Sequence, residues 1–152
     1  MQASQYDARR QLELFLSALF LPDDWIELRF IESWGSGGKS RSRVARKADW
    51  LRPRDFVTRH RELTDFALHE RANIYFGVCP RAQRDDSQDE QIRTVRCLWC
   101  DIDHVTAEDA FARWDAANVP QPSLVVRSGS GVHGYWLLEQ DVTSAQGRAL
   151  IT

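Results

Sequence analysis

The stretch 96–103 constrains this chain most, because an otherwise apolar run ends there in two acidic residues, Asp101 and Asp103. In an extended strand, side chains alternate between two faces, so these carboxylates project from the same face. Leu98, Cys100 and Ile102 project from the opposite face into a core. Two close carboxylates repel each other unless a cation lies between them, and oxygen ligands suit Mg²⁺ or Mn²⁺. The stretch predicts a divalent-metal site or, alternatively, a solvated strand end that leads into a turn.

The composition is that of a soluble globular protein, since 43% of the 152 residues are hydrophobic and 28% are charged. A chain of this length is expected to form a single domain with its own core. No stretch resembles a signal peptide, and no apolar run is long enough to span a membrane. We therefore expect a cytoplasmic protein with no membrane partner.

Cys97 and Cys100 form a C-x-x-C pair. Residues three apart on a strand face opposite sides, which is wrong for a shared zinc ion or a disulfide. These thiols are therefore expected to be core or half-buried groups, as in a reducing compartment.

The amino-terminal half predicts alternating helices and strands. Apolar residues recur at helical spacing over 12–20, and the alternating stretch 25–31 is typical of a strand. A second helix is expected over 52–70, with Pro53 in its first turn, and a buried strand over 73–78. The polar stretch 82–91 is expected to be an exposed loop.

Cationic side chains concentrate between residues 39 and 61, although the formal net charge of the chain is only −2. Such a patch on a near-neutral protein indicates a local site for a polyanion, or else a solvated surface. We expect the segment 39–47 to be a flexible hairpin or loop whose cations contact nucleic acid: Lys39, Arg41, Arg43, Arg46 and Lys47.

Gly38, Lys39 and Ser40 follow a predicted strand, which also permits a P-loop ATPase as an alternative. That match fails at its first glycine, where Ser33 stands. The residues after it alternate Ser and Arg rather than forming an apolar helix.

The carboxy-terminal half predicts a strand over 92–103 and a helix over 107–118, introduced by Thr106 as its cap. Two strands over 123–127 and 132–138 follow, and another helix begins near Thr143. The turn between the two strands consists of Ser128, Gly129, Ser130 and Gly131. Its small residues allow backbone amides and hydroxyls to approach phosphate oxygens, and the adjacent His133 is placed to donate a hydrogen bond to a triphosphate.

The two motifs together resemble the archaeo-eukaryotic primase superfamily. Residues 98–103 (LWCDID) are similar to its motif of three hydrophobic residues followed by Asp-hydrophobic-Asp, and 128–136 (SGSGVHGYW) to its Ser-x-His motif. The nearest group is the replication-associated primase-polymerases of plasmids, phages and mobile elements. Residues 73–81 also resemble the strand and Pro-Arg turn that precede the acidic motif. The resemblance covers 73–138 well and the amino-terminal region only in layout.

The resemblance implies an α+β fold, in which a core like the RNA-recognition motif carries catalysis beside an amino-terminal α/β portion. It implies template-directed nucleotidyl transfer by two divalent cations, Mg²⁺ or Mn²⁺, held by Asp101 and Asp103. His133 would contact the incoming triphosphate, helped by residues 128–131 and by Arg81. The partners would be a single-stranded DNA template, (deoxy)nucleoside triphosphates and a helicase domain or protein.

The sequence departs from the family pattern in two respects. The serine position of a strict Ser-x-His motif is Gly131, so a hydroxyl must come from Ser128 or Ser130. The family's third acidic residue, on a later strand, has no candidate after His133. We therefore expect a carboxy-terminally truncated fragment of a larger replication protein that catalyses poorly. A primase-like fold that binds nucleotide or nucleic acid without catalysis is the first alternative.

Overall fold

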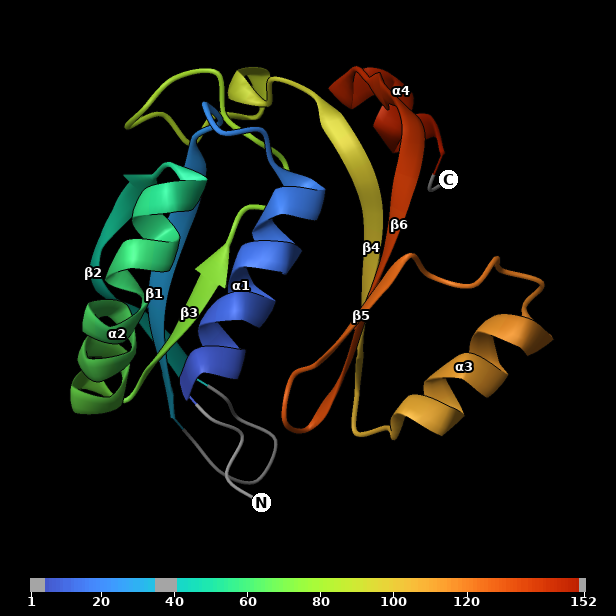
Figure 1. Ribbon diagram of the computed structural model, residues 1–152, viewed down its shortest axis with the longest axis horizontal. Coiled ribbons are helices and arrows are strands. Elements are labelled where there is room, and N and C mark those ends of the chain that lie inside the picture. Colours follow the sequence, from blue (N-terminus) through green and yellow to red (C-terminus); the bar gives the residue numbers. More distant parts are fainter. Residues whose placement is uncertain (1–4, 35–40, 151–152) are drawn as a thin grey trace. The chain divides into compact units, whose positions relative to one another are not determined.

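The structure is a computed structural model that describes residues 5–34 and 41–150, and it is of the mixed α+β type that the sequence predicts (Figure 1). The chain divides into two compact units, residues 1–93 and residues 94–152. Within the described ranges, no helix combines the length and the apolar character that a membrane crossing needs.

The first unit contains an antiparallel sheet in the order β2-β1-β3. Its strands and helices, in chain order, are α1 (Gln5–Leu19), β1 (Ile26–Trp34), β2 (Arg41–Leu51), α2 (Pro53–Glu70) and β3 (Ala72–Phe76), followed by the short 3-10 helix η1 (Asp89–Gln91).

Both long helices of the first unit cover the same face of this sheet (Figure 1). Alternation along β1 sends Ile26, Leu28 and Phe30 to that face, where all three are fully buried. The ring of Phe30 meets Phe66 of α2 edge to face at 5.3 Å between centroids. Phe76, which pairs with Leu28 and so shares its face, meets Phe15 of α1 at 5.7 Å. The aromatic residues thus fix both helices on one side.

The basic segment differs from the expectation of a flexible hairpin or loop. Residues 41–47 belong to β2, which pairs antiparallel with β1 from Trp34–Arg41 to Ile26–Leu51. The hairpin connection is therefore correct and the loop interpretation is wrong. The Ser/Arg alternation has the period of a strand, and charged side chains suit β2 because it is an edge strand that must not pair with another molecule. Lys39 lies outside the described residues.

The P-loop alternative is also wrong. A P-loop leads from a strand directly into a helix whose amino terminus faces the phosphates. Here the residues that follow Ser40 form an antiparallel strand, and the next helix, α2, begins only at Pro53.

The opposite face of the first sheet contains a buried carboxylate, Glu27. Its side chain is only 2% exposed and accepts a hydrogen bond from Arg29 Nε at 2.7 Å and one from Ser87 Oγ at 2.8 Å. The guanidinium of Arg81 forms an ion pair with its other oxygen at 2.8 Å. Burial raises the pKa of Glu27, but the bonds from Arg29 and Ser87 and the charges of Arg29 and Arg81 outweigh it and leave the pKa below the ordinary value.

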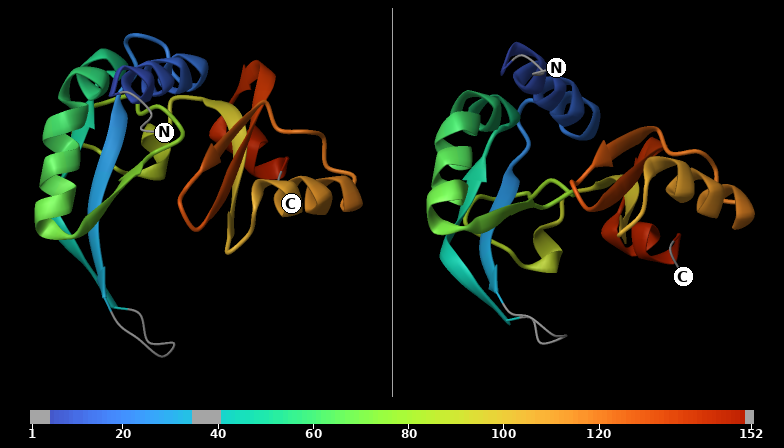
Figure 2. Two further views of the ribbon diagram at one scale, coloured as in Figure 1. Left: turned by 60° about the horizontal axis from the view of Figure 1, so that its bottom comes forward. Right: turned by 90° about the horizontal axis from the view of Figure 1, so that it is seen from below.

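The second unit contains an antiparallel sheet in the order β4-β6-β5 (Figure 2). Its elements are β4 (Val95–Asp103), α3 (Ala107–Ala116), β5 (Leu124–Arg127), β6 (Gly131–Val142) and α4 (Ser144–Ala149). Both helices start at the predicted caps. Thr106 accepts a hydrogen bond from the amide of Asp109 at 3.1 Å, and Thr143 forms a complete capping box with Gln146.

Helix α3 packs on one face of the second sheet through a small apolar cluster. Ala110, Trp114 and Val132 are its buried members, and the partly buried Cys100, Ile102 and Trp136 pack against them. Gly134 permits this contact, because a Cβ at this position would lie 2.8 Å from the indole of Trp114. The prediction that Cys100 and Ile102 project into a core is confirmed.

Replacing Glu27 with Gln is expected to destabilise the fold by about 3 kcal/mol, because the buried guanidinium of Arg81 loses its counter-charge. The wild-type contribution is complete well above the ordinary glutamate pKa of about 4.3 and is lost as pH falls through the lower pKa of the folded state. Urea denaturation between pH 7 and pH 3 measures both effects. The free energy of unfolding of E27Q should depend less on pH than that of wild type. The exposed control E90Q should behave as wild type.

Candidate functional site

The candidate site lies where β4 ends beside the start of β6. Asp101 pairs with His133 and Asp103 pairs with Gly131, and directly opposed residues in an antiparallel sheet share a face. This face is the one opposite the α3 cluster, because Cys100 and Ile102 occupy the other. The structure thus brings Asp101, Asp103 and His133 to one face, as the alternation predicts. It also places Cys97 and Cys100 on opposite faces of β4, where they form no disulfide.

The turn before β6 lies at the end of the site and is hydrogen-bonded to the residue that follows β4. The amide of Ser128 donates to the carbonyl of Gly131 at 3.0 Å, and Gly129 has a positive φ of 98°. The amide of His104, just after β4, donates to the carbonyl of Ser130 at 2.8 Å. The residues of the predicted phosphate turn, Ser128, Gly129 and Ser130, are exposed.

Gly131 explains why the strict Ser-x-His motif is not followed. A Cβ at this position would lie 2.3 Å from the carbonyl oxygen of Ile102, which real side chains do not tolerate. With the strands this close, serine cannot replace Gly131. A hydroxyl for phosphate contact must therefore come from Ser128 or Ser130.

His133 is held between two polar groups. Its Nε2 lies 3.3 Å from Oδ1 of Asp101, and its Nδ1 lies 3.4 Å from the hydroxyl of Tyr135. Burial raises the pKa of Tyr135 to about 12, with further contributions from Cys97 and Asp101, so the phenol keeps its proton at neutral pH. A phenol that donates to Nδ1 favours the imidazole tautomer with its proton on Nε2. That tautomer points an N–H toward the carboxylate.

The carboxylates on this face can supply part of the coordination shell of a hard cation. The side chain of Asp101 is 54% exposed and Asp103 is also exposed, so both carboxylates are open to ligands. Mg²⁺ often takes one or two protein carboxylates and completes its shell with water and substrate phosphates. Among the described residues, however, no three His, Cys, Asp or Glu side chains are grouped to hold a metal ion. The residues therefore fit a cation that shares its coordination with a phosphate ligand.

Arg81, which the sequence assigns to nucleotide binding, is buried within the first unit. Its guanidinium pairs with Glu27 and donates to the carbonyl of Gln88 at 3.0 Å. Its backbone forms isolated bridges with Trp25 and Ile92. These contacts give Arg81 a structural role in holding the loop after β3.

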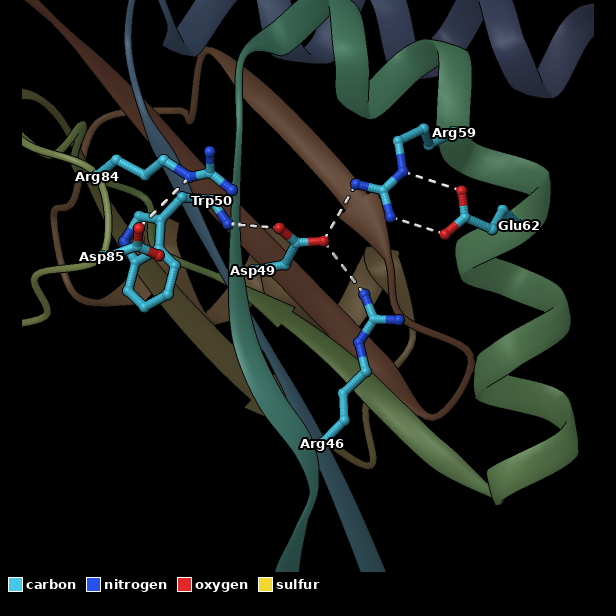
Figure 3. A network of polar contacts seen from close by, with 7 residues as sticks. All are labelled: Arg46, Asp49, Trp50, Arg59, Glu62, Arg84 and Asp85. Atoms are coloured by element: carbon cyan, nitrogen blue, oxygen red, sulfur yellow. Dashed lines mark hydrogen bonds and ion pairs between the residues drawn. The ribbon is translucent and has the colours of Figure 1, made fainter.

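Part of the predicted basic surface is neutralised by its own neighbours (Figure 3). Asp49 accepts from Arg46 at 3.3 Å and from Arg59 at 3.1 Å, and Arg59 also pairs with Glu62 at 2.7 Å. Those contacts, above all the hydrogen bond to Glu62, raise the pKa of Arg59 further above its ordinary value. The guanidinium of Arg46 also lies 3.9 Å from the ring centroid of Phe30.

Other cations between residues 39 and 61 differ in how available they are to a ligand. Arg43 pairs with Glu32 across the strands, and the side chain of Arg41 lies outside the described ones. Lys47 and Arg54 are exposed and form no ion pair with any described side chain. The region 39–61 therefore presents fewer cations to a ligand than the sequence suggests.

Two residues on the site face were not assigned a role from the sequence. Tyr135 contacts His133, and Trp99 is 51% exposed beside Asp101 on β4. The two-residue alternation that groups Asp101 with Asp103 also includes Trp99, so the signal was available.

Comparisons with known proteins support the fold. No protein-family model and no curated protein matches the chain. Among solved structures, it is similar to the AEP domain of the primase-polymerase (PrimPol) of cyanophage S-2L, with a TM-score of 0.60 and 21% sequence identity. The match covers 94% of this chain and 71% of that one, so it includes residues of both units. The chain therefore has an α+β fold like that of this domain, which confirms the predicted fold class.

Proposed function

We propose that this chain binds nucleoside triphosphates with a divalent cation and serves template-directed nucleotidyl transfer, as part of a DNA-replication protein. One observation carries the proposal. The exposed carboxylates of Asp101 and Asp103 lie on the same sheet face as His133, which contacts Asp101, and a turn of small residues lies beside them. The primase-like fold supports it, because the similar cyanophage domain belongs to a primase-polymerase.

Asp101 and Asp103 are the proposed ligands of Mg²⁺ or Mn²⁺. When bound, a pair of such cations lowers the pKa of an attacking hydroxyl and neutralises a departing pyrophosphate. The two carboxylates hold the positive charge at the end of β4, where the exposed turn leaves room for phosphate oxygens. The open coordination positions noted above suit a substrate that brings its own oxygen ligands.

His133 is the proposed contact to the triphosphate. The imidazole tautomer that a donating Tyr135 phenol favours carries its proton on Nε2. This N–H can donate to a phosphate oxygen instead of to Asp101. The backbone amides and hydroxyls of residues 128–130 are exposed beside it and can donate to the same group. These residues bind and orient the phosphates for in-line attack.

The cations of β2 and α2 are proposed to contact the single-stranded DNA template. Lys47 and Arg54 carry this proposal, since both are exposed and unpaired among the described side chains. Lys39, Arg41 and Arg43 remain proposed contacts of the same kind. Arg46 is not part of this proposal, because its guanidinium is held by Asp49 and Phe30.

A non-catalytic nucleotide-binding module is the second candidate. The observation that favours it is that the described residues assemble no third metal ligand beside Asp101 and Asp103. Such a module would bind the triphosphate through the same face without turning it over.

Asp101→Asn and Asp103→Asn are each expected to weaken Mn²⁺-dependent binding of a nucleoside triphosphate by at least about tenfold, because each removes a charged ligand. Titration calorimetry with and without Mn²⁺ measures the effect. The control Glu139→Gln, an exposed carboxylate on β6, should leave the affinity unchanged. Equal Mn²⁺ dependence in wild type and both Asp variants would contradict the metal assignment.

Wild type and a double variant of the two aspartates separate the two candidates in an incorporation assay with labelled nucleotides, Mn²⁺ and a single-stranded template. Incorporation by wild type, and none by the double variant D101N/D103N, is the expected result for nucleotidyl transfer. Nucleotide binding without any incorporation would favour the non-catalytic module.

Lys47→Ala is expected to weaken single-stranded DNA binding and to lower the slope of log affinity against log salt by about 0.7, as for one lost phosphate contact. Arg46→Ala should instead lower the free energy of unfolding by about 1 kcal/mol, because it removes the contact with Phe30. Fluorescence anisotropy over a salt series and urea denaturation measure these effects. Loss of DNA affinity on Arg46→Ala alone would contradict the template assignment.

A further inference from the structure

Trp99 is exposed in a way that the fold does not explain. Its relative exposure is 51%, whereas Trp50 and Trp114 are each 5% exposed. Trp136 also has a structural role, since its ring packs on Trp114 and its Nε1 donates to the carbonyl of Pro120 at 2.6 Å. No ring among the described residues stacks on Trp99. An exposed indole loses the free energy of burial, about 25 cal/mol for each Å² left in water.

The indole of Trp99 belongs to the same face as the candidate site. It lies two residues before Asp101 on β4 and pairs with Tyr135, which itself lies two residues after His133 on β6. Its neighbours in the chain, Leu98 and Cys100, belong to the face that α3 covers. Successive side chains on one face of a strand are about 6.8 Å apart. On the site face of β4, Trp99 therefore adjoins Asp101 on the side away from Asp103.

The chemistry along this face changes from polar to aromatic over three pairs. The first is Asp103 with Gly131 at the turn, the second is Asp101 with His133, and the third is Trp99 with Tyr135. A nucleoside triphosphate has the same polarity, with charged phosphates at one end and an aromatic base at the other. With its phosphates beside the acidic pair and the turn, such a ligand can reach Trp99 with its base.

Stacking is also the contact that template-directed synthesis permits. A base that is selected by pairing with the template must be accepted whatever its identity, so hydrogen bonds from the protein to its pairing edge would compete with the template. Every base has a π-face, and stacking on an aromatic side chain tolerates all of them.

We propose that Trp99 is the stacking platform for the base of the incoming nucleoside triphosphate. This inference rests on the proposed function, because it assigns the base subsite of the same nucleotide. It makes Trp99 a binding residue that contacts substrate without taking part in the chemistry.

The test compares triphosphate ligands that have and lack a base. Trp99→Ala is expected to weaken binding of ATP and of UTP by about 5-fold to 150-fold in the presence of Mn²⁺, the range that corresponds to one lost base stack. Binding of inorganic tripolyphosphate should stay within about twofold of wild type. Trp99→Phe, which keeps a ring, should retain most of the affinity for both nucleotides. Val125→Ala, at an exposed position of β5 on the α3 face, is the matched control.

Titration calorimetry gives distinct outcomes for this inference and for the proposed function. If Trp99→Ala binds ATP and UTP as wild type does, the stacking assignment is overturned while nucleotide binding stands. If Trp99→Ala weakens binding of a single-stranded oligonucleotide and not of nucleotides, the indole contacts the template and the assignment is again overturned. A wild-type chain that binds neither nucleotide would overturn the proposed function and this inference together.

Discussion

The pairing of β4 with β6 is the interaction on which the candidate site depends. It sets Asp101 opposite His133 and Asp103 opposite Gly131, and a slip of β6 by one residue would send His133 to the face covered by α3, away from Asp101. Two glycines hold the register. Gly131 lets the strand pass close to the carbonyl of Ile102, and Gly134 leaves room for the indole of Trp114. Helix packing on one face thus secures the geometry of the other.

The polar residues at the end of the site face are exposed, whereas two groups of polar residues in the first unit are engaged with one another. Glu27, Arg29, Arg81 and Ser87 form a network around the buried carboxylate of Glu27, and Asp49 pairs with Arg46 and Arg59. A charge engaged in this way stabilises the fold and has little left to offer a ligand. Asp101, Asp103 and the turn after β5 lie exposed, so the end of β4 is able to form new polar contacts.

Most of the fold, and the core of the site, follow from local patterns in the sequence. Two-residue alternation predicts β1, β4 and β6 and groups Asp101 with Asp103, and the caps Thr106 and Thr143 predict where two helices begin. β2 was missed as a strand because its alternation is of Ser and Arg, with little apolar signal. The role of Arg81 depends on Glu27, a partner distant in sequence, and no local pattern contains such a pair.

The central claim is that the carboxylates of Asp101 and Asp103 hold a divalent cation together with a nucleoside triphosphate. Anomalous diffraction from a crystal soaked with Mn²⁺ and a non-hydrolysable nucleoside triphosphate tests it most directly. The account predicts a manganese peak at about 2.1 Å from oxygens of both carboxylates, with phosphate oxygens completing its shell. A strong peak elsewhere, with none at these two side chains, would contradict it.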